Sequence, residues 1–357
     1  MKDRINIYCE YAFWSAFFDD ERDALKDRNR RKAWDCFFDF LCANKLFLGI
    51  APTDIDESTC GGKAILDFRQ ATGGAGIHFL SGGLPSITEL NNNEHEKLNS
   101  VFLTTKQNAE CKELSNKFGV IVLNKDMVYE AKHLFDDCGR PFIKKKLPNW
   151  SYLNEYGNNA PSINCCNSLL IVDRYLFSGS NHENVFDNNL MPIFEALLPQ
   201  KLADGIVFNI CIFSDISSPN FYDGSEEIEE IIDEIRPKLN FDLKVIDTRR
   251  IHDRVIITNN IMLSCGAGFD VIGSDGLPIK FTNTSLTFPF LSGKSINREN
   301  YLGWIYTVLN EQSKCHKTIP TNHHILNNYY EKPRSRHNYN SYSIPLMSSH
   351  RASGIVG

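Results

Sequence analysis

Residues 248–270, TRRIHDRVIITNNIMLSCGAGFD, contain the side chains whose types and spacing most clearly suggest chemistry. The first part of this segment carries four cationic or titratable side chains: Arg249, Arg250, His252 and Arg254. A small-residue loop near its end contains Ser264 and Gly266. Arginine can bind a phosphate through two hydrogen bonds, and histidine changes its charge near neutral pH. The segment therefore predicts a phosphate-binding site made by His252, Arg254, Arg250, Ser264 and Gly266.

The strand expected after this cluster would place its side chains in alternation. His252 and Arg254 would share one face, and Asp253 would point to the other. The loop at Ser264 would return beside them across a hairpin and offer backbone N–H groups. In the alternative interpretation Arg254 pairs with Asp253 or Asp247, and His252 merely ends a strand.

A second apolar run, SLLIVDRYLF, carries Asp173 and Arg174 at the point where another strand is expected to end. Strand ends on one edge of a sheet lie close together, so these two residues could lie beside the 248–270 cluster.

The 248–270 pattern resembles one half of a phospholipase-D-type site, in which His and Lys lie two residues apart and an Asp follows. Here Arg254 stands in place of the Lys, and Asn259 stands in place of the Asp. Such an enzyme needs two half-sites, and the chain offers one. The His-Asp-Arg spelling is more similar to the phospholipase-D-like domain at the C-terminus of MIT-domain proteins, which is a binding module. The resemblance implies phosphate recognition; a metal-independent phosphodiesterase acting through a phosphorylated His252 is a further alternative.

A second candidate site consists of carboxylates in the first half of the chain. Glu10 follows the apolar run INIYC, and Asp126 follows another expected strand. The carboxyl ends of parallel strands form crevices, so we expect Glu10 and Asp126 to converge with Asp20, Asp67 or Glu110. Clustered carboxylates hold Mg²⁺ or Mn²⁺, which activate water and stabilise charge on a phosphate. In the alternative interpretation, Glu10 caps a helix start and Asp126 lies in a first helical turn, where acids are favoured.

The layout of residues 4–137 resembles a PIN-like nuclease domain: a strand, a helix, paired helices, and then the segment SVFLTTKQNAECKELSNKFGVIVLNKDMV. Glu10 takes the place of the usual first Asp. PIN domains carry another acid just after the strand that matches residues 101–105. Here Lys106 occupies that region, and the first acid is Glu110. The resemblance implies Mg or Mn as cofactor, catalytic roles for Glu10, Asp126 and Glu110, and metal-ligand roles for Glu10, Asp126 and Asp67.

Apolar patterns of strands and helices alternate along both halves of the chain, which predicts an α/β fold with two domains. We expect a PIN-like parallel sheet in residues 1–138 and a phospholipase-D-like mixed sheet in residues 151–315. The stretch 139–150, with two prolines and three consecutive lysines, is expected to be an exposed linker. A glycine-rich stretch, 73–83, is expected to be a loop.

From residue 316 the composition becomes polar and basic, which predicts a tail, 316–357, that is flexible alone or ordered by a partner. This tail contains the pair His323-His324. The absence of zinc-ligand spacing around the pair favours solvated side chains over a metal site.

Length and composition set the remaining bounds. The chain has 357 residues, 42% of them hydrophobic, and a formal net charge of −6, which argues against nonspecific nucleic-acid binding over the whole surface but not against a local basic groove. Its 11 cysteines are odd in number and lack C-x-x-C spacing, and no secretory signal or long apolar run is present. We therefore expect a reduced, cytoplasmic protein without a membrane span.

Together these patterns predict a metal-dependent endonuclease-type effector, a hydrolase of RNA or DNA in a bacterial defence or toxin context, with a phosphate-recognising C-terminal domain. Nucleic acid is the expected partner, with RNA favoured over DNA. The alternative is a non-catalytic adaptor that binds nucleic acid or a partner protein, for which the 316–357 tail is a candidate contact. A homo-oligomer is compatible with either function.

Overall fold

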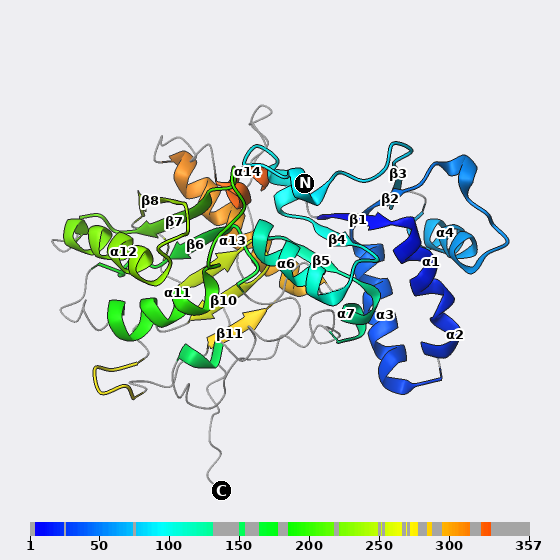
Figure 1. The fold of residues 1–357 in the computed structure, drawn as a ribbon. Helices are drawn as coiled ribbons and strands as arrows, with labels where there is room; N and C mark the ends of the chain where they lie inside the picture. The colour runs from blue at the N-terminus through cyan, green and yellow to red at the C-terminus, as the bar shows by residue number, and fades with distance from the viewer. Residues whose placement is uncertain are drawn as a thin grey trace, which may run out of the picture.

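The structure is a computed structural model. It describes residues 4–24, 26–73, 76–130, 150–153, 164–177, 185–217, 221–248, 251, 254–265, 269, 272–277, 284–287, 295–314 and 323–329. These residues form two α/β units, each built on its own sheet: the N-terminal unit, 4–130, on the right in Figure 1 and the C-terminal unit, 150–329, on the left.

The N-terminal unit contains a five-stranded sheet in the order β3-β2-β1-β4-β5, with every pair parallel. Its strands are β1 Asn6–Glu10, β2 Lys45–Gly49, β3 Ile77–Phe79, β4 Val101–Leu103 and β5 Ile121–Leu123. Its helices are α1 Tyr11–Asp19, α2 Glu21–Ala24, α3 Arg28–Ala43, α4 Cys60–Ala71, α5 His95–Leu98, α6 Asn108–Phe118 and α7 Lys125–Glu130, with 3-10 turns η1 Pro52–Asp54 and η2 Ile87–Glu89. The predicted parallel sheet is confirmed. The 73–83 loop prediction is wrong at β3, because a three-residue strand is too short to show an alternating pattern.

Helix α3 illustrates how local sequence makes these elements. The Asp27 carboxylate caps the helix by accepting hydrogen bonds from the backbone N–H groups of Asn29 and Arg30. Trp34, Phe37 and Leu41 then recur with helical spacing and are buried, as the sequence predicts. The buried stripe packs into a cluster of aromatic rings beneath the sheet, with centroids 5.0 Å apart for Phe17 and Phe37.

The C-terminal unit contains a six-stranded sheet in the order β11-β10-β9-β6-β7-β8. Its strands are β6 Ser168–Val172, β7 Phe208–Ser214, β8 Phe241–Asp247, β9 Val255–Thr258, β10 Met262–Cys265 and β11 Thr284–Thr287. Its helical segments are η3 Trp150–Leu153, η4 Phe186–Leu190, α11 Met191–Leu197, α12 Phe221–Ile235, α13 Ser295–Lys314 and α14 His324–Tyr329. Strands β6, β7 and β8 are parallel, and β9, β10 and β11 pair antiparallel, so the predicted mixed sheet is confirmed.

The linker prediction is wrong at its last residue. Trp150 is buried and donates from its indole Nε1 to Asn189 Oδ1 at 2.8 Å. A large aromatic side chain at the end of a polar stretch has therefore joined the C-terminal core. The rest of the predicted linker, 139–149, lies outside the described residues.

The two units meet at the amino-terminal ends of their parallel strands. Asn167, just before β6, donates from Nδ2 to the carbonyl oxygens of Leu98 and Gly119, at 2.8 and 2.9 Å. Asn259, just after the antiparallel β9, donates to the Gly119 carbonyl at 3.0 Å. Since Leu98 and Gly119 precede β4 and β5, these contacts, here called the amide seam, join amino edge to amino edge. The carboxyl edges of the two sheets therefore lie on opposite sides of the seam.

Gly119 is required at this seam for two reasons. It ends α6 with φ of 61°, a left-handed conformation that glycine adopts without strain. A Cβ at this position would also overlap the carbonyl group of Cys166, which belongs to the other unit.

Helix α14 completes the seam from the C-terminal side. His324 lies 3.0 Å from Asn167 Oδ1 through Nδ1 and 2.7 Å from Asn92 Oδ1 through Nε2. His323 lies 3.1 Å from the Leu169 carbonyl oxygen through Nε2. Both rings are buried, so the prediction of a solvated His323-His324 pair is wrong. Burial lowers the pKa of His323 to about 4 and holds the pKa of His324 well below its ordinary value.

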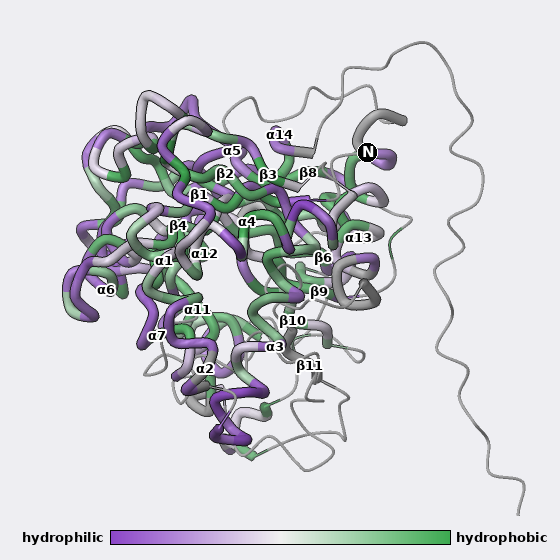
Figure 2. Tube along the Cα trace, turned by 90° about the vertical axis from the view of Figure 1, so that its right-hand side faces the viewer, coloured by the Kyte–Doolittle hydropathy of each residue, from purple (hydrophilic) through white to green (hydrophobic). Residues whose placement is uncertain are grey.

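The buried apolar side chains of both units form one continuous cluster that crosses the seam. Figure 2 shows hydrophobic residues concentrated on the inner strands, whereas outer segments such as α2 and α6 are largely hydrophilic. None of the described helices has the combination of length and apolarity needed to cross a bilayer.

Candidate functional site

The carboxyl edge of the second sheet brings together residues from three separate strand ends. Asp173 follows β6, Asp215 follows β7, and Arg254 immediately precedes the antiparallel β9. Val172 pairs with Val255, so Asp173 and Arg254 are neighbours across the strands. Arg254 Nε lies 3.6 Å from Asp173 Oδ1, which confirms the expectation that Asp173 lies beside the 248–270 segment. We call the group Asp173, Arg174, Tyr175, Asp215 and Arg254 the carboxyl-edge cluster.

Asp173 anchors this cluster from within the protein. Only 4% of the residue is exposed, and its Oδ1 accepts a hydrogen bond from the Tyr175 backbone N–H at 2.9 Å. Burial raises the pKa of the Asp173 carboxyl, and the Tyr175 amide and the Arg254 guanidinium act in the opposite direction. The buried carboxylate therefore fixes the position of Arg254.

Tyr175 carries the outer part of the cluster. Its side chain is one of the few large hydrophobic ones in the described chain that are exposed, at 43%. The guanidinium carbons of Arg174 and Arg254 each lie 5.3 Å from the centre of its ring. Arg174 also forms an ion pair with Asp215, with Nε 3.9 Å from Oδ2. Each arginine is thus held by an aspartate and lies against one exposed aromatic ring.

The hairpin after Arg254 returns as predicted. Ser264 pairs with Val255 across β9 and β10, and the Cys265 N–H donates to the Arg254 carbonyl oxygen at 3.0 Å. At the same edge, the Thr248 hydroxyl is buried and has no hydrogen-bond partner in the described structure. Three residues of the predicted phosphate site, His252, Arg250 and Gly266, lie outside the described residues, as does Arg249.

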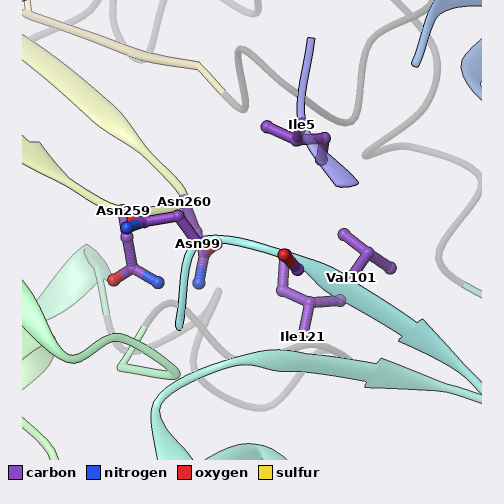
Figure 3. A pocket seen from close by; sticks show the side chains of 7 residues that line it. Ile5, Asn99, Val101, Ile121, Asn259 and Asn260 are labelled. Atoms are coloured by element: carbon purple, nitrogen blue, oxygen red, sulfur yellow. The ribbon is translucent and has the colours of Figure 1, made fainter. Parts of the chain in front are cut away.

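Asn259 does not belong to this edge. It follows β9, whereas Arg254 precedes the same strand, so the two residues occupy opposite ends of it. The position that the phospholipase-D pattern gives to a carboxylate is here a buried amide of the seam. Asn259 and Asn260 also line a small pocket, with Asn99 beside them and Ile5, Val101 and Ile121 on the other side (Figure 3). Its cavity volume is about 10 Å³, roughly the space of one water molecule, so this pocket is too small for a small-molecule ligand.

The carboxyl edge of the first sheet holds Glu10 at the end of β1, as predicted. Its carboxylate accepts hydrogen bonds from the Thr104 hydroxyl at 2.7 Å, the Thr105 N–H at 2.8 Å and the Thr105 hydroxyl at 2.9 Å. Glu10 stands at the N-cap position of α1, as in the alternative interpretation, but its side chain makes no capping hydrogen bond to that helix. Glu10 instead ties the end of β1 to the end of β4.

The other predicted ligands face different partners. Glu110 forms an ion pair with Lys106, and Asp20 pairs with Lys125 at 2.8 Å and Arg30 at 3.6 Å. Asp126 is exposed in the first turn of α7, which fits the alternative interpretation, and Asp67 is exposed on α4.

The predicted convergence around Glu10 and Asp126 is therefore not found. In the described part of the chain, no three His, Cys, Asp or Glu side chains are grouped so that they could hold a metal ion. The physical reason is visible at Glu10, whose two carboxylate oxygens are turned to threonine donors. The described residues therefore form no carboxylate cluster for Mg²⁺ or Mn²⁺ at this edge.

Comparison with known proteins adds no family to this description. The chain matches no protein-family model, and no curated protein is significantly similar to it.

Sequence reasoning missed Tyr175 and Asp215 as members of the cluster. Tyr175 directly follows Asp173-Arg174 in the run SLLIVDRYLF, so an aromatic residue at a charged strand end was the available signal. Asp215 joins through the parallel pairing of β6 and β7, and its own sequence neighbourhood carries no comparable signal.

Proposed function

We propose that this protein is a non-catalytic adaptor that binds single-stranded nucleic acid through the carboxyl-edge cluster. The observation that carries the proposal is the exposed Tyr175 ring with the guanidinium groups of Arg174 and Arg254 against it. In this arrangement a base stacks on the ring, and the neighbouring phosphates bind the arginines.

The aspartates make this arrangement favourable for binding. A guanidinium carries five N–H donors in a planar fork, so one arginine can serve a carboxylate and a phosphate together. Asp173 and Asp215 hold the arginines before the ligand arrives, which reduces the entropy lost on binding. The adjoining sequence supplies three further cationic or titratable side chains: Arg249, Arg250 and His252.

A single strand fits the site better than a duplex, because a base must leave its stack to reach an exposed tyrosine. A single-stranded nucleic acid is therefore the favoured ligand, and RNA remains the expectation from the sequence. The resemblance of 248–270 to a phosphate-recognising phospholipase-D-like module supports the same conclusion. We derive no metal-dependent cleavage, because the described carboxylates are not grouped around one point.

Fluorescence anisotropy with a labelled single-stranded RNA, and with DNA of the same sequence, tests the proposal. Replacing Tyr175 with Ala should weaken binding by about 1–3 kcal/mol, the contribution of one stacked base. Replacing Arg254 with Ala should weaken it by about 1.5–3 kcal/mol and should reduce the salt dependence.

Arg30→Ala is the matched control. Its guanidinium also lies over a tyrosine ring, that of Tyr129 at 4.7 Å, and also pairs with an aspartate, but it belongs to the other unit. Its affinity should equal that of the wild type. Equal binding by wild type and Tyr175→Ala would refute the proposed site. Cleavage of either nucleic acid with Mg²⁺ or Mn²⁺, abolished in a folded Glu10→Gln variant, would instead establish the nuclease.

A further inference from the structure

Strand β8 forms an edge of the second sheet. It pairs with β7 on one side, and no described strand lies on its other side (Figure 1). Of its seven residues only Ile246 is fully buried, and the other six are partly exposed. An edge of this kind presents backbone hydrogen-bonding groups that another strand can use.

The direction of these groups follows from the hydrogen bonds to β7. The Phe208 N–H donates to the Asn240 carbonyl oxygen, and the Thr248 N–H donates to the Ser214 carbonyl oxygen. Backbone groups alternate along a strand, so the even-numbered residues between 240 and 248 also face β7. Phe241, Leu243 and Val245 therefore direct their N–H and C=O groups outward.

Two side chains of opposite charge alternate with these outward-facing residues. Asp242 and Lys244 lie two residues apart on one face of the strand and form an ion pair, with Nζ 2.9 Å from Oδ2. Their side chains are 36% and 40% exposed, so both can also reach a neighbouring strand.

We propose that β8 pairs antiparallel with β8 of a second copy of this chain, with Leu243 opposite its own counterpart on the two-fold axis. Phe241 then lies opposite Val245 of the second copy, and the outward backbone groups of these residues form the ladder. Asp242 lies opposite Lys244 of the second copy, and Lys244 opposite its Asp242. These are the non-hydrogen-bonded positions, where opposing Cβ atoms are closest and opposite charges stabilise the pair.

The charges select this register over its neighbours. Sliding one strand by two residues in one direction places Lys244 opposite Lys244 of the second copy. Sliding it by two residues in the other direction places Asp242 opposite Asp242. Intermediate registers bring opposite faces of the strand together. Charges of one sign on an edge would oppose all self-pairing, whereas this Asp-x-Lys spacing is self-complementary.

Sedimentation velocity of the full chain over a broad concentration range tests the proposal. The wild type should form a concentration-dependent dimer. Lys244→Asp and Asp242→Lys each place like charges opposite one another twice, so each should weaken the dimer by about tenfold or more. A mixture of the two variants restores opposite charges at both positions and should form a heterodimer.

Lys201→Asp is the matched control, because Lys201 also pairs with a nearby aspartate, Asp204, but lies outside the strands. It should dimerise like the wild type, and circular dichroism should show that every variant is folded. A wild type that stays monomeric would overturn the proposal. A dimer that both charge variants leave intact, or singly impaired variants that do not associate when mixed, would also overturn it.

Discussion

At the carboxyl edge of the first sheet Glu10 accepts hydrogen bonds from uncharged donors, whereas at the carboxyl edge of the second sheet Asp173 and Asp215 pair with arginines. Both edges have the strand-end geometry in which ligands commonly bind. Two threonine hydroxyls and one backbone N–H donate to the Glu10 carboxylate, which thereby joins the ends of β1 and β4. Arginines carry their charge outward, towards an exposed ring. The comparison shows that an acid at a strand end indicates a ligand site only when the residues that pair with it are also known.

The largest expected effect comes from removing the buried acid of the second edge. Asp173→Ala leaves the Arg254 guanidinium without its carboxylate and removes the acceptor of the Tyr175 N–H. Loss of one member of a buried ion pair typically costs about 3–5 kcal/mol of stability. Urea denaturation followed by tryptophan fluorescence measures the change. Asp215→Ala removes a more exposed and longer ion pair and should cost about 1 kcal/mol or less of stability. Equal losses of stability in the two variants would show that Asp173 does not stabilise the edge more than Asp215 does.

A slightly smaller effect is expected at the seam that separates the two edges. The pKa of His323 is about 4 in the folded protein, against an ordinary value of 6.5. The unfolded chain therefore takes up the proton first, and the free energy of unfolding falls as the pH is lowered from about 6.5 towards 4, by ~3 kcal/mol in total from this group.

Urea denaturation at a series of pH values measures this dependence. His323→Gln should reduce this dependence and leave the part of the same sign that comes from buried His324, while His78→Gln, a change at an exposed histidine of β3, should leave the dependence at its wild-type size. A wild-type stability that is constant across this window would show that His323 does not titrate as described.

Glu10 gives the next test, because its role is to join strands. Glu10→Ala removes an acceptor of three hydrogen bonds and should lower the free energy of unfolding by about 2–3 kcal/mol. Glu10→Gln keeps one acceptor oxygen and should cost about 1–2 kcal/mol. Neither change should alter RNA affinity in the anisotropy assay. Weaker binding by folded Glu10→Gln would mean that the first edge also contacts the ligand.

The smallest effect is expected at the exposed pair formed by Lys106 and Glu110. Glu110→Ala should change the free energy of unfolding by about 0.5 kcal/mol or less, since exposed ion pairs contribute little. Thermal denaturation can place this limit, with Lys106→Ala as the reciprocal variant. A large loss of stability or of RNA affinity would assign Glu110 a role that its exposed position does not suggest.

Sequence patterns predicted the features that depend on neighbouring residues. The alternation of strands and helices, the helical stripe through Trp34 and Phe37, and the hairpin from Arg254 to Ser264 are all local, and each is confirmed. The position of Asp173 beside Arg254 was also accessible, because charged residues at two strand ends share one edge.

The errors concern contacts between distant segments. His323 and His324 stand in a polar stretch, but their partners lie more than 150 residues away along the chain, at Leu169 and Asn167. The phospholipase-D pattern aligns Asn259 with its Asp, whereas the Asn259 amide donates a hydrogen bond to the Gly119 carbonyl oxygen of the N-terminal unit. Local composition reports whether a segment can be solvated. It does not report whether a complementary surface exists elsewhere.

The position of α14 has a consequence for how the protein is made. The five strands of the first sheet are complete once Leu123 has left the ribosome, whereas His324 follows about 200 residues later. At typical synthesis rates of about 5–20 residues per second, this interval lasts roughly 10–40 s. Throughout it the Asn92 side chain lacks the histidine that it contacts in the finished protein, and Asn167 lacks the same partner from its own synthesis onward. The part of the seam that α14 supplies is therefore added only after the strands of both sheets have been synthesised.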